Sequence, residues 1–181
     1  LAYCRGGDLR NEINKRIKKK KASGEFIEET IVYNWFKQLC MGLKVIHKNS
    51  FIHRDLVCYM CSLQIQNNTL SYKKKTQKPE NIFFEADDCR VVKIGDFGLA
   101  TVLNSRIAQT KTVGTQMYMA PEQFSAKEYN HAADIWSLGT ILLELLALQQ
   151  FDVKSEIVKD PFFVRKQREK LQAVYSEPLL E

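Results

Sequence analysis

His53-Arg54-Asp55-Leu56 and Lys78-Pro79-Glu80-Asn81 form the two halves of one motif, and residues 57–77 stand between them. When these 21 residues are removed, the halves join as H-R-D-L-K-P-E-N, which fits the pattern H-R-D-L-x-x-x-N. The motif places an aspartate carboxylate and an asparagine amide at the two ends of a short loop. The asparagine amide supplies a hard oxygen atom of the kind that Mg²⁺ prefers.

Four further motifs follow this interrupted loop. They are Asp96-Phe97-Gly98, Gly114-Thr115, Ala120-Pro121-Glu122 and Asp134-Ile135-Trp136-Ser137-Leu138-Gly139. Any one of them could arise by chance, and a single Asp or Asn is usually only a cap or turn residue. Five motifs in this order are not a chance result. The chain therefore resembles a protein kinase.

The resemblance implies a role for each matching residue. Asp55 would accept or orient the proton of the substrate hydroxyl, and Asn81 and Asp96 would bind Mg²⁺ together with the phosphates of ATP. Lys78 would place a positive charge near the transferring phosphate. Lys78 and Thr115, in the substrate-binding loop, resemble the serine/threonine-specific pattern.

The first nine residues, L-A-Y-C-R-G-G-D-L, resemble the hinge between the two kinase lobes. By this resemblance the backbones of Ala2 and Cys4 would meet adenine, Asp8 would approach the ribose, and Phe83 would lie under the adenine ring. The 181 residues contain no G-x-G-x-x-G and no V-A-x-K, the motifs of the small lobe. We therefore expect residues 1–181 to be a partial kinase domain, with the hinge and large C-terminal lobe but without the N-terminal lobe.

A deletion is expected near residues 150–154. The helix predicted at 134–148 leads almost directly to residues 154–163, which resemble the last helix of a kinase domain. The intervening helices would carry the arginine that usually pairs with the glutamate at Glu122. A buried carboxylate without its partner costs several kcal/mol, so a less stable lobe is expected.

Two kinase groups share features with this chain. The hinge Y-C-x-G-G-D-L, residues 102–105 and Pro161-Phe162-Phe163 with the basic tail resemble the NIMA-related kinases. Residues 119–123 and Tyr129-Asn130-His131 resemble the stress kinases that phosphorylate a translation initiation factor. The NIMA-related group is the better match.

Residues 101–115 would form the activation loop. Thr110 and Thr112 are candidate phosphorylation sites, because a phosphate there could pair with Arg54 and order the loop. The alternative is that both are ordinary loop hydroxyls.

The expected fold class is α+β and mainly α, a kinase-like large lobe with a small β-hairpin at the cleft. Apolar spacing predicts helices over 9–21 and 28–49, and β-rich runs at 82–84 and 91–94 predict the hairpin that presents Asn81 and Asp96. The composition of residues 57–77 shows no helical or strand repeat. Its first and last codons, for Val and Gln, can carry the GT and AG of an intron, which suggests a retained in-frame intron.

Composition limits the remaining possibilities. With 45% hydrophobic residues, 181 residues can bury one sizeable core. The first residues do not have the charged-then-apolar pattern of a signal segment, and the apolar run 135–148 contains Glu144 and is too short to cross a bilayer. We expect no membrane partner and a cytoplasmic protein, with the nucleus or cytoskeleton as alternatives.

Charge and cysteines add two expectations. The net charge of +6 comes from lysine and arginine clusters without interleaved aromatic residues, so solvated helix faces are favoured over nucleic-acid binding. Five cysteines in a chain without a secretory signal indicate reduced thiols. Cys58-Tyr59-Met60-Cys61 lacks the second ligand pair of a zinc site.

The predicted function is that of a serine/threonine protein kinase that uses ATP and Mg²⁺ to phosphorylate protein hydroxyls, with this chain alone inactive. The alternative is a non-catalytic kinase remnant that binds a partner protein through exposed large-lobe surface. The sequence leaves the substrate, the upstream activator and the oligomeric state open.

Overall fold

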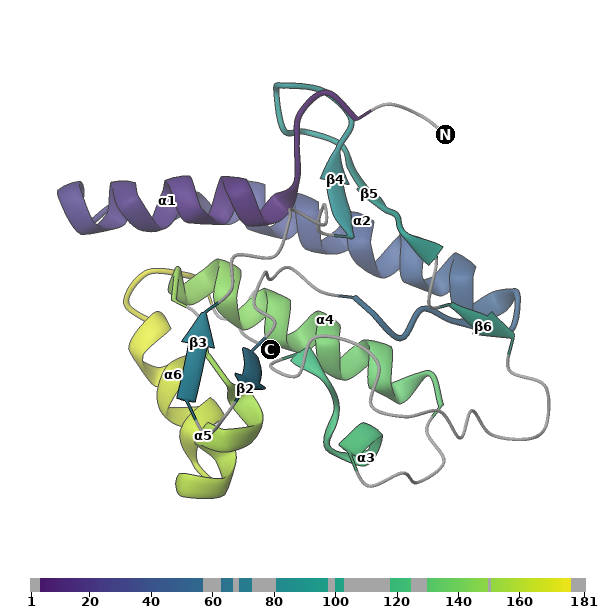
Figure 1. Cartoon of the computed structure of the whole chain (residues 1–181). Helices are drawn as coiled ribbons and strands as arrows, with labels where there is room; N and C mark the ends of the chain where they lie inside the picture. The colour runs from purple at the N-terminus through teal and green to yellow at the C-terminus, as the bar shows by residue number, and fades with distance from the viewer. Residues whose placement is uncertain are drawn as a thin grey trace.

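The computed structural model describes residues 4–56, 63–66, 69–72, 81–97, 100–102, 118–124, 130–149 and 151–176. Helices dominate this part of the chain, and the strands form three two-stranded antiparallel sheets. In Figure 1, α1 and α2 cross the upper half, α4 lies below them, and α5 and α6 lie at the lower left. The predicted α+β, mainly α class is confirmed.

Two helices follow the hinge segment. α1 spans Leu9–Ser23 and begins at the N-cap Asp8, whose carboxylate accepts a hydrogen bond from the backbone N–H of Asn11. It ends at Gly24, which has the left-handed φ of 73° and donates its backbone N–H to the carbonyl of Lys20, a conformation that glycine adopts without steric cost. α2 spans Glu29–Lys48. Both match the predicted ranges to within two residues.

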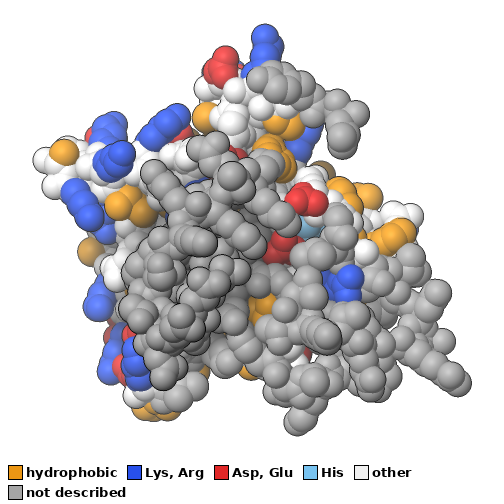
Figure 2. All heavy atoms as spheres, viewed as in Figure 1, with side chains coloured by type: hydrophobic (Ala, Val, Ile, Leu, Met, Phe, Trp, Pro, Cys, Tyr) orange, Lys and Arg blue, Asp and Glu red, His pale blue; other side chains and the backbone are white. Residues whose placement is uncertain are grey.

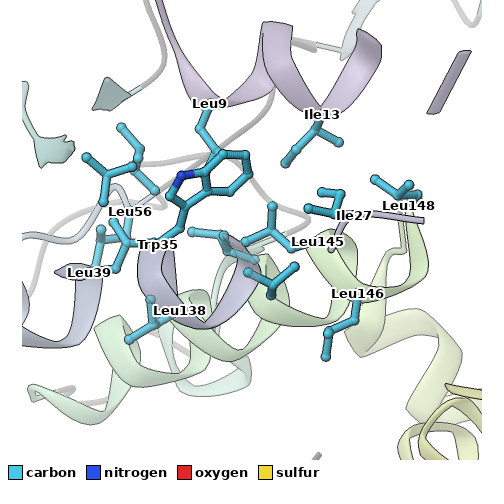
Figure 3. Close-up of a cluster of buried hydrophobic side chains, with 14 of the residues drawn as sticks. Leu9, Ile13, Ile27, Trp35, Leu39, Leu56, Leu138, Leu145, Leu146 and Leu148 are labelled. Carbon is cyan, nitrogen blue, oxygen red and sulfur yellow. The ribbon is translucent and has the colours of Figure 1, made fainter. Parts of the chain in front are cut away.

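The core forms where three helices present apolar faces to one another. α2 buries Val32, Trp35, Leu39 and Leu43 at helical spacing. Figure 3 shows Trp35 between Leu9 of α1 and Leu145 of α4, the helix that spans Ala132–Ala147. Because α4 meets neighbours on most of its sides, its sequence is apolar nearly all round.

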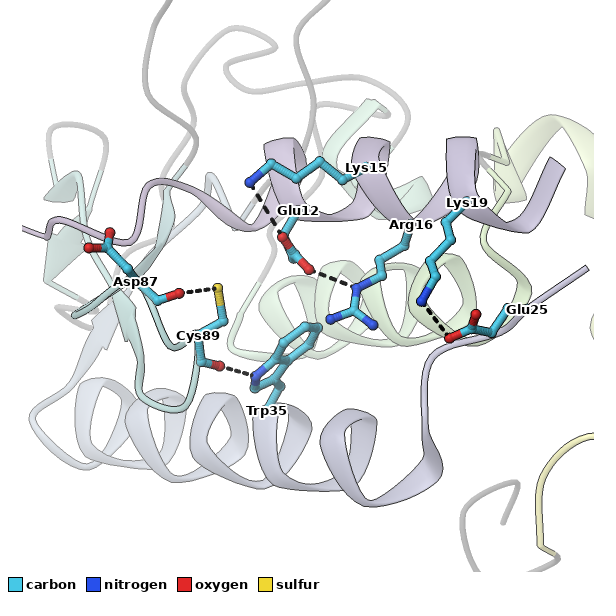
Figure 4. A network of polar contacts seen from close by, with 8 residues as sticks. All are labelled: Glu12, Lys15, Arg16, Lys19, Glu25, Trp35, Asp87 and Cys89. Atoms are coloured by element: carbon cyan, nitrogen blue, oxygen red, sulfur yellow. Dashed lines mark hydrogen bonds and ion pairs between the residues drawn. The ribbon is translucent and has the colours of Figure 1, made fainter. Parts of the chain in front are cut away.

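The predicted hairpin is present beside α2. β4 (Ile82–Phe84) and β5 (Val92–Ile94) pair antiparallel, with Ile82 opposite Ile94. The indole Nε1 of Trp35 donates a hydrogen bond to the carbonyl of Cys89 at 2.6 Å, across the turn of this hairpin (Figure 4). Trp35 thus ties the hairpin to α2 as well as filling the core.

Three shorter helices complete the described part of the chain. α3 spans Pro121–Phe124, α5 spans Val153–Lys159, and α6 spans Phe163–Leu171. Beyond α6, the Tyr175 hydroxyl donates to the carbonyl of Ile27 at 3.1 Å, and the backbone N–H and hydroxyl of Ser176 donate to the Glu29 carboxylate. These bonds attach residues 175–176 to the start of α2, and the two from Ser176 lower the pKa of the Glu29 carboxyl.

One small sheet joins a strand before the insert to a strand after it, and a second small sheet lies within the insert. β1 (Phe51–Ile52) pairs with β6 (Thr101–Val102). β2 (Leu63–Gln66) pairs with β3 (Thr69–Tyr72) inside residues 57–77, so the expectation of no strand repeat there was wrong. Each strand alternates apolar and polar residues over four positions, and Asn67-Asn68 between them suits a two-residue turn. So short a pattern does not stand out in composition.

Three other expectations have definite outcomes. Glu122 is half-buried and not enclosed, so the predicted cost of a buried, unpaired carboxylate does not arise at this position. Cys40 and Cys89 are free thiols, as expected, while Cys58 and Cys61 lie outside the described residues. Within the described ranges, no helix is both long enough and apolar enough to span a bilayer.

Candidate active site

The first half of the interrupted motif is fixed from below by α4. The Asp134 carboxylate, only 1% exposed, accepts the backbone N–H of His53 at 2.9 Å and that of Arg54 at 2.9 Å. The same carboxylate is 2.8 Å from Nε2 of His47, near the end of α2. Arg54 itself has a φ of 66°, so the loop turns sharply at this point. Asp134 therefore sets the backbone from which Asp55 projects.

The two halves of the motif meet in space. The Asn81 side-chain nitrogen donates to the backbone carbonyl of Asp55 at 2.6 Å and to its carboxylate oxygen Oδ2 at 3.0 Å. Asn81 is 3% exposed, so these are well-shielded hydrogen bonds. The 21-residue insert therefore leaves Asp55 and Asn81 in direct contact.

The hairpin brings Asp96 to the same place. Gly95 donates its backbone N–H to the carbonyl of Asn81 at 2.8 Å, and its own carbonyl lies 3.0 Å from Nε2 of His53. Asp96, the next residue, is exposed and has a φ of 51°, a strained region that is common at functional sites. The Gly95 backbone thus connects Asp96 both to Asn81 and to His53, which lies two residues before Asp55.

The donor set suits a magnesium ion. Asn81 uses its amide nitrogen for Asp55, which leaves its amide oxygen for a cation, and Asp96 offers a carboxylate. Mg²⁺ is commonly held by one or two protein oxygens together with substrate phosphates. Within the described ranges, no cluster of three or more His, Cys, Asp or Glu side chains could hold a metal ion.

The hinge residues lie beside β4. Gly6 and Gly7 exchange backbone hydrogen bonds with Phe84, and Asp8 forms an isolated bridge with Phe83. A Cβ on Gly6 would lie 2.1 Å from the carbonyl oxygen of Ala86, so this close approach requires glycine. The hinge segment is consequently hydrogen-bonded to the hairpin along β4.

The nucleotide contacts predicted for the hinge segment and for Phe83 stay predictions. Both carboxylate oxygens of Asp8 accept hydrogen bonds at 2.7 Å, one from the backbone and one from the side chain of Asn11. Asp8 thus caps α1, whatever contact it makes with a ribose. Phe83 is half-buried and packs over Gly95, where a Cβ would lie 2.9 Å from its ring. Cys4 is half-buried.

Five predicted site residues lie outside the described residues. They are Ala2, Lys78, Thr110, Thr112 and Thr115. Their roles stay predictions that follow from the motifs alone.

A buried polar group that joins α1 and α4 was not predicted. Arg10 of α1 is 5% exposed and Glu144 of α4 is 1% exposed. Their contacts are bidentate, at 2.5 Å for Nη1 to Oε1 and 2.7 Å for Nη2 to Oε2. Tyr118 accepts from Arg10 at 2.7 Å and donates to Glu144. Glu144 interrupts an apolar run in α4, but Arg10 is one of many charged residues in α1 and gave no signal.

Comparison with known proteins identifies the family. A family model described as "Protein kinase domain" matches residues 77–175, more than half of the chain. The match begins one residue before Lys78, where the interrupted motif resumes. The chain belongs to the protein kinase family. The motif resemblance is therefore confirmed.

Its relatives include NIMA-related kinases of animals and plants. The chain is 40% identical over 154 residues to the serine/threonine-protein kinase Nek2 of Mus musculus, covering 82% of the chain and 29% of that protein. It is 36% identical over 150 residues to Nek1 of Mus musculus (82% and 10%) and 34% identical over 163 residues to Nek3 of Oryza sativa subsp. japonica (88% and 23%). The NIMA-related assignment is confirmed. This kinase chain spans less than a third of each of these relatives.

Proposed function

We propose that Asp55, Asn81 and Asp96 form the catalytic centre of a serine/threonine protein kinase, which transfers the γ-phosphate of ATP to protein hydroxyl groups. The observation that carries the proposal is the pair of hydrogen bonds from the Asn81 amide to Asp55. These bonds assemble the catalytic loop across an insert of 21 residues.

Each residue has a role that its surroundings support. The Asn81 amide holds one carboxylate oxygen of Asp55, so the aspartate is oriented to take a proton from a substrate hydroxyl. The Asn81 oxygen and the Asp96 carboxylate would bind Mg²⁺, which when bound neutralises phosphate charge. Lys78, two residues after Asp55 once the insert is ignored, would add a positive charge at the transferring group.

The small-lobe motifs set the conditions for activity. Because the Gly-rich loop and its lysine position the ATP phosphates, and the 181 residues contain neither motif, we expect no measurable phosphotransfer from this polypeptide alone. Activity should require a small lobe joined at residue 1. The alternative function, a non-catalytic protein-binding module, predicts that no such addition restores transfer.

The test is a chimera in which the small lobe of mouse Nek2 precedes Leu1, made with and without residues 57–77. Transfer of radiolabelled phosphate to casein is measured, and the phosphoamino acids are identified. We expect phosphoserine or phosphothreonine from the shortened chimera and a loss of at least a hundredfold with Asp55→Asn, on the order expected for a catalytic proton acceptor.

Asp88→Asn provides the matched control, since Asp88 is an exposed aspartate in the turn of the hairpin and should leave transfer unchanged. If the shortened chimera transfers no phosphate, or if Asp55→Asn leaves transfer intact, the catalytic proposal is wrong. In the first case the protein-binding alternative becomes the better account.

A further inference from the structure

The outward side of α2 carries an unusual mixture of side chains. Tyr33, Met41 and Val45 are 53%, 60% and 61% exposed, which places them among the most exposed large hydrophobic residues of the described chain. Lys37, Lys44 and Lys48 are also exposed. At 100° per residue, all six lie on the arc opposite the buried row of Val32 and Leu39. We call these six residues the α2 outer face.

The lysines of the α2 outer face have no fixed counter-ions. Within the described part of the chain, Lys37, Lys44 and Lys48 take part in no ion pair. They follow one another at spacings of seven and four residues, so they form a nearly straight row about 16 Å long at 1.5 Å per residue. A row of unpaired positive charges between exposed apolar side chains is complementary to a segment that alternates carboxylates and apolar residues.

The basic surface of α1 differs in both respects. Figure 2 shows lysine and arginine side chains gathered over α1 at the left of the molecule. There Arg16 contacts Glu12 at 2.7 Å and Lys19 contacts Glu25 at 2.7 Å, and no large hydrophobic residue of α1 is among the exposed ones. α1 satisfies much of its own charge and offers no apolar contact. It is therefore a solvated face and a suitable control.

The apolar part of the α2 outer face continues onto the hairpin. Gln38 of α2 bonds the carbonyl of Arg90 at 2.9 Å and the backbone N–H of Val92 at 3.1 Å. These bonds hold Val91, which is 40% exposed, beside α2. Arg90 adds one more cation whose side chain is 84% exposed, with only a 3.7 Å contact to Asp88. The surface is thus broader than a single helix.

We propose that the α2 outer face binds an acidic amphipathic helix of a partner protein. Such a helix, about fifteen residues long, would lay its apolar residues on Met41 and Val45 and its carboxylates on the lysine row. The apolar side chains favour a protein segment over a nucleic acid, whose phosphates would use only the lysines. The proposal is independent of phosphotransfer, because none of these residues belongs to the catalytic loop.

The test uses the 181-residue chain and a fluorescein-labelled 16-residue peptide designed as an amphipathic helix. Its Leu residues recur at i, i+4 spacing, and its Glu residues recur at i, i+4 spacing beside them. Binding is followed by fluorescence anisotropy. We expect Lys37→Glu with Lys44→Glu to weaken binding about tenfold, as does raising NaCl from 50 to 500 mM. Met41→Ser with Val45→Ser should weaken it about fivefold. A peptide with Lys in place of Glu should not bind.

The matched control is Lys18→Glu with Lys21→Glu on α1, which makes the same change in net charge and should alter affinity less than twofold. Circular dichroism checks that every variant is folded. Equal losses from the α1 and α2 pairs would show non-specific attraction and overturn the proposal. Tighter binding of a single-stranded RNA or of phosphatidylserine vesicles would also overturn it. So would a fivefold gain in affinity on removing residues 177–181, which would make the chain's own acidic tail the occupant.

Discussion

Replacing Arg10 with methionine should destabilise the lobe more than any surface change. Methionine keeps the length of the side chain but removes the guanidinium, which makes two contacts with the Glu144 carboxylate, at 2.5 and 2.7 Å, and one with the Tyr118 hydroxyl. The side chains of Arg10 and Glu144 are only 6% and 2% exposed. The Glu144 carboxylate would therefore stay buried. The Tyr118 hydroxyl would still donate a hydrogen bond to it, but the positive charge of Arg10 would be gone.

The magnitude follows from what is left behind. Removing one partner of a buried ion pair typically costs about 3–5 kcal/mol, because the remaining charge stays desolvated. Two hydrogen bonds to a charged group at about 1.5–3 kcal/mol each give about 3–6 kcal/mol, a range that overlaps the first. With a urea m-value of about 2 kcal/mol/M, the midpoint should fall by about 1.5–2.5 M. That is a large share of a typical total stability of about 5–15 kcal/mol.

Urea unfolding followed by circular dichroism measures this shift, and two further variants make it specific. Arg16→Met removes the pair with Glu12, in which the arginine is 26% exposed, and should cost at most about 1 kcal/mol. Adding Glu144→Leu to Arg10→Met removes the stranded charge and should recover part of the loss. The reasoning is refuted if Arg10→Met costs no more than Arg16→Met, or if the double variant is less stable than the single one.

Three other changes have expected outcomes. Asp134→Ala leaves the backbone N–H groups of His53 and Arg54 without their acceptor. At about 1–3 kcal/mol for each buried group, it should lower the free energy of unfolding in urea by about 3 kcal/mol, and a loss below about 0.5 kcal/mol would contradict this. Burial raises the pKa of Tyr175 to about 12, so the folded state holds this proton more tightly than the unfolded state. Stability should be complete below pH 10 and fall by about 2 kcal/mol on the way to pH 12, and Tyr175→Phe, compared by thermal unfolding at each pH, should lack this fall. Deleting residues 57–77 should raise the free energy of unfolding by about 2 kcal/mol, because the connection shortens from 24 to 3 residues. Unchanged or lower stability would show that the insert makes stabilising contacts with the rest of the chain.

The sequence predicts well where local patterns carry the information. α1, α2 and the hairpin of β4 and β5 follow from apolar spacing and from turn residues, both of which act over a few positions. The contact between Asp55 and Asn81 was also predictable, because a motif matched across the gap implies one loop. In each case the signal lies within a short stretch or within a known order of motifs.

Long-range pairing explains what the sequence could not show. Arg10 and Glu144 are 134 positions apart, and each alone is simply one charged residue in a helix. Glu122 was assigned a buried environment from its motif, yet it is half-buried, because burial depends on which elements pack around it. The hairpin of β2 and β3 was missed because four-residue alternation is too short to distinguish from chance.

The insert is compatible with the site because each of its ends is anchored independently of it. On the N-terminal side, Asp134 holds two backbone N–H groups and Leu56 is fully buried in the core. On the C-terminal side, Ile82 is fully buried, and Asn81 reaches back to Asp55. The described contacts that hold the two ends of the interrupted loop therefore come from residues outside 57–77. Asp55 and Asn81 are held directly, whereas Lys78 lies between the last inserted residue and the first C-terminal anchor. A displacement of about 1 Å can cost on the order of a hundredfold in rate, so any catalytic penalty of the insert should act through Lys78 and disappear when the insert is removed.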